Sequence, residues 1–186
     1  DSPIGAAGLM GCFKYESDMR TDNLENSYND QFGMSDAEYT NAVNNGQESE
    51  QQFITGRNAT AWAGQKPGSA VGYGIAQFTS QDLKRGIYDR TVKKGKSIAS
   101  LEPQLDAIMD VLKQRGIYDT INNAKTPTDA NKTFLWKYEA GNGYTSDEAV
   151  LNDYPWMLSS NPNGVILRHN YAEQVYNTYK DWSPKK

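Results

Sequence analysis

Apolar residues recur every three or four positions through most of the chain, a spacing that predicts a mainly helical protein. The first predicted helix has an N-cap at Ser2 and proline at its first position, and it ends near Glu16. Further helices are predicted from Ser35 to Gly46, from Ser80 to Gly95, from Leu101 to Gly116, from Pro127 to Tyr138 and from Val165 to Tyr179.

One short segment, residues 71–78, has the composition of a β-strand instead. Its two glycines, Gly72 and Gly74, indicate a bend or a close approach of backbone to a ligand. We therefore expect a small β-hairpin beside the helices. Residues 18–33, 47–69 and 142–164 are rich in polar residues, asparagine or glycine and are predicted to be loops.

The length of 186 residues fits one domain, and no linker divides the pattern. We therefore treat residues 1–186 as a single domain. Because the chain begins at Asp1 without a methionine, we expect it to be excised from a longer polypeptide. No apolar run is long enough for a membrane span, so none is expected.

The net charge and the low counts of cysteine and histidine limit which partners and reactions are expected. The net charge is -4 and no basic stripe extends beyond Lys93, Lys94 and Lys96, so nucleic acid is not an expected partner. Cys12 is the only cysteine and His169 the only histidine. These counts exclude an internal disulfide and a zinc site built from several cysteines or histidines, and we expect neither a metal nor a cofactor. Any catalysis must rest mainly on carboxylates.

Glu16 is the carboxylate with the most informative position, because a helix of small and apolar residues ends there. The negative pole of that helix and the neighbouring Phe13 and Tyr15 both disfavour the charged form. A protonated glutamic acid is what cleavage of a glycosidic bond requires. Taken alone, however, a glutamate at a helix end is more often a solvated surface residue.

Two other segments combine aromatic and polar groups. In residues 72–79 (GYGIAQFT), Gln77 and exposed backbone are suited to a polar ligand, and Tyr73 or Phe78 to a sugar face. In residues 134–139 (FLWKYE), a carboxylate, Glu139, follows an aromatic residue, Tyr138, at a helix end. Taken alone, the first segment is more often an ordinary hairpin with a tight turn, and core packing with a solvated acid explains the second segment equally well.

In this order, the segments resemble the phage tail lysozyme family of the lysozyme-like superfamily. The resemblance is carried by residues 6–17 (AAGLMGCFKYES), 72–79, 134–139 and 168–176 (RHNYAEQVY), and so it covers nearly the whole chain. It implies a lysozyme-like α+β fold, mainly α, with the hairpin beside a cleft. It also implies a bacteriolytic muramidase that degrades the peptidoglycan of the bacterial cell wall.

Residue by residue, the resemblance makes Glu16 the catalytic acid and places Gln77 along the glycan cleft. Tyr73, Phe78, Tyr138 and Glu139 are the other expected substrate-binding residues. The expected partners are peptidoglycan strands and the other domains or subunits of a tail particle or lysin. The expected location is the virion tail or the extracellular side of the bacterial wall.

The sequence leaves the second catalytic group and the reaction outcome open. Asp30 and Glu25 are the candidates for a second carboxylate, since both follow Glu16 in a predicted loop. The family usually has a proline step after the residue pair matched by Tyr138 and Glu139, whereas this chain continues with Ala140 and Gly141. A lytic transglycosylase, a glucosaminidase and an inactive wall-binding module of the tail therefore remain alternatives.

Overall fold

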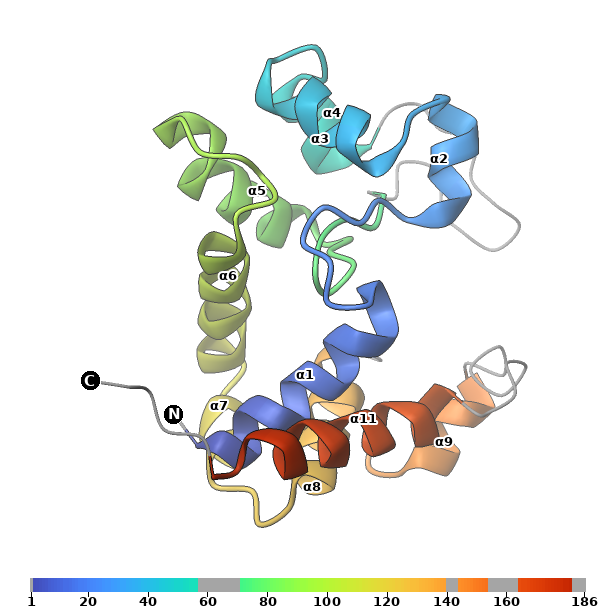
Figure 1. Ribbon diagram of the computed structural model, residues 1–186, viewed down its shortest axis with the longest axis vertical. Coiled ribbons are helices and arrows are strands. Elements are labelled where there is room, and N and C mark those ends of the chain that lie inside the picture. Colours follow the sequence, from blue (N-terminus) through green and yellow to red (C-terminus); the bar gives the residue numbers. More distant parts are fainter. Residues whose placement is uncertain (1, 57–70, 140–143, 154–163, 182–186) are drawn as a thin grey trace. The chain divides into compact units, whose positions relative to one another are not determined.

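The computed structural model describes residues 2–56, 71–139, 144–153 and 164–181 and divides into two compact units. Unit 1 contains Asp1–Met19 and Leu112–Lys186, and unit 2 contains Arg20–Val111. Both units are built from helices, as Figure 1 shows, so the prediction of a mainly helical protein is confirmed. None of the helices within the described ranges is long and apolar enough to cross a membrane.

The helices of unit 1 are α1 (Pro3–Ser17), α7 (Tyr118–Asn122), α8 (Pro127–Phe134), the π-helical turn η2 (Leu135–Glu139), α9 (Asp147–Asp153) and α11 (Gly164–Tyr179). Those of unit 2 are α2 (Asn26–Phe32), α3 (Asp36–Asn44), α4 (Glu50–Thr55), α5 (Gln81–Arg90) and the 3₁₀ turn η1 (Val92–Lys94). Helix α6 (Leu101–Gln114) contains the boundary between the units.

Helix α1 is the centre of unit 1 and packs against both α8 and α11, which lie beside it in Figure 1. The Ser2 side chain accepts a hydrogen bond from the Gly5 amide and caps its start. A methyl group at Gly8 would lie 2.4 Å from the Cβ of Ala130 on α8, and one at Gly11 would lie 2.5 Å from the Arg168 carbonyl on α11. Because these glycines have no side chains, α8 and α11 can approach α1 closely. This packing fixes the position of α1 in the unit, including its last turn.

Unit 2 has a core of its own, in which half of the buried side chains are aromatic. Tyr73 lies at its centre, with ring centroids 5.8 Å from those of Tyr39 and Phe53. The other members of this buried cluster are Leu24, Tyr28, Val43, Ile54, Val71, Tyr88 and Ile98. Residues 71–79 therefore belong to the framework of unit 2.

The predicted β-hairpin is wrong. Within the described ranges, the only β pairing is a single antiparallel bridge between Leu24 and Tyr73. Residues 71–78 instead form a turn in which Gly74 has a φ of 81° and Gln77 a φ of 46°. The chain reverses through these two left-handed residues before a strand can extend.

The loop predictions are wrong in part. Short helices form in segments whose polar composition gave no clear helical pattern. Helix α2 lies within residues 18–33, α4 within 47–69 and α9 within 142–164. Helix α4 has a complete capping box, in which Ser49 and Gln52 bond to each other's backbone amides. The remaining loop predictions for residues 57–69, 142–143 and 154–163 lie outside the described residues.

Candidate functional site

The last turn of α1 places Glu16 beside a buried arginine. The Ser17 hydroxyl donates to the Phe13 carbonyl at 3.1 Å, and Asp18 ends the helix with a left-handed φ of 54°. The Glu16 side chain is 20% exposed, and its Oε1 pairs with Nη2 of Arg168, which is fully buried. Glu16 is therefore held in place while part of its side chain is still exposed to solvent.

Arg168 is held in place from three directions. Its Nη1 donates to the Gly164 carbonyl at 3.0 Å, one turn earlier in α11, and its guanidinium lies 3.7 Å from the centre of the Tyr15 ring. The third contact is the ion pair with Glu16. This ion pair fixes the position of the Glu16 side chain, and the protonated state expected for Glu16 stays a prediction.

A second carboxylate, Glu139, lies close enough to this ion pair to interact with its charges. Burial raises the pKa of Glu139 well above its usual range, and the charge of Glu16 raises it further, against the opposing charges of Arg168 and Arg115. Its Oε1 is buried and has no hydrogen-bond partner among the described residues. The surroundings of Glu139 therefore favour its protonated form.

The π-helical turn η2 explains how Glu139 reaches this position. It follows α8 directly, and a π turn shifts every later side chain around the helix axis. Within it, the Tyr138 ring stacks on Phe134 with centroids 4.4 Å apart, and Arg115 donates to the Lys137 carbonyl at 3.0 Å. Burial also raises the pKa of Tyr138, so its phenol stays neutral.

The candidate site in unit 1 thus consists of Glu16, Arg168 and Glu139, with Tyr15 and Tyr138 beside them. We refer to the first three residues as the carboxylate–arginine cluster. The sequence analysis found both glutamates but assigned no role to Arg168. The available signal was its spacing in α11, because Val165, Arg168 and Ala172 occupy one buried face.

The predicted ligand-binding residues of unit 2 are used differently. Tyr73 is 0% and Phe78 2% exposed, and the Tyr73 hydroxyl shares a 2.7 Å hydrogen bond with Thr40. Both rings lie in the core of unit 2, and their role in substrate binding stays a prediction. Gln77 is half-buried, and its amide nitrogen donates to the Asn23 and Gly74 carbonyls at 3.1 and 3.3 Å. Its role toward a ligand stays a prediction.

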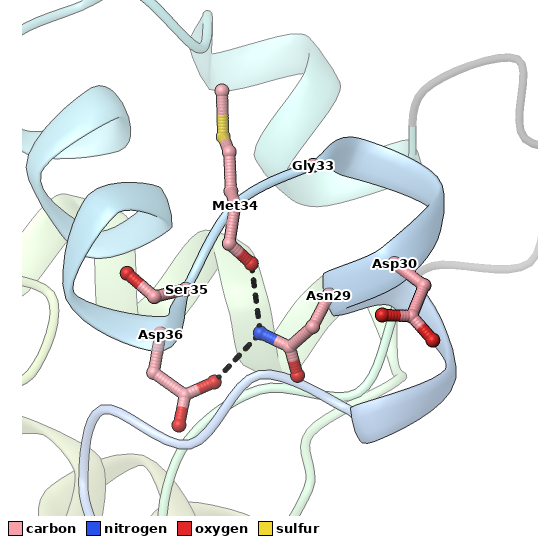
Figure 2. A pocket seen from close by; sticks show the side chains of 6 residues that line it. All are labelled: Asn29, Asp30, Gly33, Met34, Ser35 and Asp36. Carbon is pink, nitrogen blue, oxygen red and sulfur yellow. Dashed lines mark hydrogen bonds between the residues drawn. The ribbon is translucent and has the colours of Figure 1, made fainter.

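The two candidates for a second carboxylate, Glu25 and Asp30, also belong to unit 2. Glu25 accepts a hydrogen bond from the Gly72 amide at 3.0 Å and so supports the turn. Asp30 is exposed and lines an open hollow of about 530 Å³ together with Asn29 and Asp36. In Figure 2 the hydrogen bonds join Asn29 to Met34 and Asp36 and leave Asp30 aside. A catalytic role of Glu25 or Asp30 stays a prediction.

His169, on the last helix, forms hydrogen bonds within unit 1. Its Nδ1 lies 2.7 Å from Oδ1 of Asn131, and its Nε2 lies 3.2 Å from Oδ2 of Asp147. Trp136 donates to the other oxygen of Asp147 at 2.8 Å. In the part of the chain that the structure describes, no group of three His, Cys, Asp or Glu side chains is arranged to hold a metal ion.

Comparison with known proteins gives one match. The family model described as phage tail lysozyme matches residues 2–179, which include every residue of the carboxylate–arginine cluster. No curated protein and no solved structure matches the chain.

Proposed function

The chain belongs to the phage tail lysozyme family, which indicates a lysozyme-like role in degrading peptidoglycan, and on this premise we propose that it is a muramidase with Glu16 as its general acid. The observation that carries the proposal is the place of Glu16: a partly exposed carboxylate at the end of α1, fixed by a fully buried arginine. Long glutamate side chains at helix ends are otherwise free to move in water.

The proposed reaction is cleavage of the glycosidic bond between two sugars of the peptidoglycan strand. Glu16 in its protonated form gives its proton to the glycosidic oxygen while the bond from that oxygen to the anomeric carbon breaks. The leaving sugar departs as an alcohol, and positive charge develops on the remaining ring. Water then attacks the anomeric carbon and loses a proton to the carboxylate of Glu16, which restores the acid.

The proposed setting is a larger particle that brings the chain to the wall. At a net charge of -4 the chain gains no long-range attraction to an anionic cell wall. Attachment to a tail structure or to other lysin domains would replace that attraction. We therefore propose action at the bacterial wall from the virion tail or from outside the cell.

Analysis of the products tests the proposed chemistry. Purified peptidoglycan is digested with the chain, and the soluble fragments are reduced with borohydride and identified by mass spectrometry. The proposal predicts reduced muramic acid at the new ends. Reduced glucosamine ends would mean a glucosaminidase, and anhydromuramic ends, formed by internal attack of the muramic hydroxyl, a lytic transglycosylase. A folded chain that binds several wall types but releases no fragments would be a binding module.

A further inference from the structure

We propose that Glu139 is a positioning residue that stores the proton Glu16 needs, so that the two carboxyl groups share one proton beside Arg168. This inference rests on the proposed function, because it concerns how the same acid is charged for the reaction. It answers a difficulty in the resting structure. A carboxylate paired with a buried arginine has no proton to give to a glycosidic oxygen.

The charges around Glu139 come from three neighbouring parts of unit 1. From α1 it interacts with Glu16 and with the thiol of Cys12, from α11 with Arg168, and from the residues after α6 with Arg115. Arg115 is exposed and is also engaged with the Lys137 carbonyl and the Tyr138 ring, 5.4 Å away. Its charge is therefore weakened by solvent, and Arg168 is the main buried cation of the cluster.

Charge balance favours one proton on the pair of glutamates. Two ionised carboxylates beside one buried guanidinium would leave a net negative charge away from water, and such a charge is costly. One bound proton makes the cluster neutral. The buried Oε1 of Glu139, which accepts no hydrogen bond from any described residue, is the unfavourable place for an anion and so the favourable place for that proton.

The other titratable groups near Glu139, Cys12 and Tyr138, do not supply the shared proton. Burial raises the pKa of the Cys12 thiol, whose sulfur accepts a hydrogen bond from Asn131 at 3.3 Å. Burial and the neighbouring glutamate likewise raise the pKa of Tyr138. Both groups stay neutral in the range where a carboxyl pair titrates, so the exchangeable proton belongs to the glutamates.

In the proposed step, the proton passes from Glu139 to Glu16, and Arg168 exchanges one carboxylate partner for the other. At rest Glu139 is neutral and Glu16 is ionised against Arg168. For the reaction the O–H bond of Glu139 breaks, an O–H bond forms on Glu16, and the charge of Arg168 is balanced by Glu139 instead. The total charge of the cluster does not change in this step. Glu16 now has the proton that the glycosidic oxygen receives.

The pH dependence of kcat/KM tests the proposal in the whole chain. The alkaline limb of the profile reports loss of the shared proton. In Glu139→Gln, Glu16 faces Arg168 without a second carboxylate, so it loses its proton at lower pH. We expect the alkaline limb to move down by one pH unit or more and the activity above it to fall at least tenfold, with the acidic limb retained. The matched control Glu148→Gln, an exposed residue of α9, should leave both limbs in place.

A second variant keeps the buried carboxyl group and is expected to shift the alkaline limb in the opposite direction. Arg115→Met takes away a charge that lowers the pKa of Glu139, so the alkaline limb should move to higher pH. If both variants fold and neither shifts the alkaline limb, the proposal is overturned. If Glu139→Gln does not fold, an unshifted alkaline limb in Arg115→Met is enough to overturn it. A wild-type chain that cleaves no glycan would instead refute the proposed function, which separates the two failures.

Discussion

The end of α1 in unit 1 and the glycine-rich turn of unit 2 each combine aromatic rings with a neighbouring glutamate, yet their polar groups are satisfied to different degrees. In the turn, Gln77 and Glu25 bond to backbone groups, and Tyr73 bonds to Thr40. In the cluster, Arg168 faces two carboxylates, and Glu139 keeps a buried oxygen without a partner among the described residues. The polar groups of the turn are therefore satisfied within unit 2, whereas the cluster keeps the buried oxygen on which our proposal of a shared proton rests.

The largest expected effect comes from Glu16→Gln, which keeps the shape of the side chain and removes its titratable proton. Loss of a general acid lowers rates by about 10²–10⁴-fold, so fragment release from peptidoglycan should fall by that factor. The rate of release is compared with that of Glu148→Gln in the same unit, after circular dichroism shows that both variants are folded. Full activity in Glu16→Gln would place the chemistry elsewhere and break the comparison.

A smaller effect is expected from the buried lysine of unit 2. Lys84 is fully buried, donates to the Val71 carbonyl at 2.6 Å, and lies 4.7 Å from the centre of the Phe53 ring. Burial lowers the pKa of Lys84 to about 7, although the charge of Glu25 opposes the shift. Between pH 7 and 10 the unfolded chain therefore binds a proton at Lys84 that the folded chain does not.

The sign of the resulting pH dependence follows from this difference. The free energy of unfolding of the parent should fall as the pH drops from 10 to 7, by several kcal/mol at most, and this contribution stays lost below pH 7. Lys84→Met removes it and should flatten the profile, which urea titrations at a series of pH values measure. Parallel profiles of the parent and Lys84→Met would contradict the burial of a neutral lysine.

The smallest effect is expected from Tyr73→Phe, which separates a core residue from a sugar-binding one. Loss of the hydrogen bond to Thr40 should lower the free energy of unfolding by about 1 kcal/mol. Activity on peptidoglycan should stay within twofold of the parent, because the ring has no face exposed to a ligand. A large rise in KM at unchanged stability would show instead that Tyr73 contributes to substrate binding.

Sequence reasoning succeeded where local rules decide the outcome. The proline and cap at the start of α1, the capping box of α3 and the apolar spacing of α6 each predicted a helix that the structure contains. It failed at residues 71–78, where β-forming residues are bent into a turn by left-handed Gly74 and Gln77. It also missed α2 and α4, whose polar residues obscure their short buried faces.

The site shows the same division between local and tertiary information. Glu16 was found because it ends a helix, which is a local property. The part played by Arg168 could not be predicted, since 152 positions separate it from Glu16 and only the packing of α1 on α11 joins them. The protonation of Glu139 depends likewise on burial, on Glu16 and on two arginines from other elements.

The most direct test of the central claim is a carbon-13 NMR titration of the glutamate carboxyl groups in the folded chain, with Glu139→Gln used to assign the Glu139 signal. The account predicts that Glu139 is still protonated well above the usual range of a glutamate carboxyl group, and that its titration perturbs the Glu16 signal. A Glu139 carboxyl that ionises in the usual range of a glutamate, without any effect on the Glu16 signal, would contradict the account.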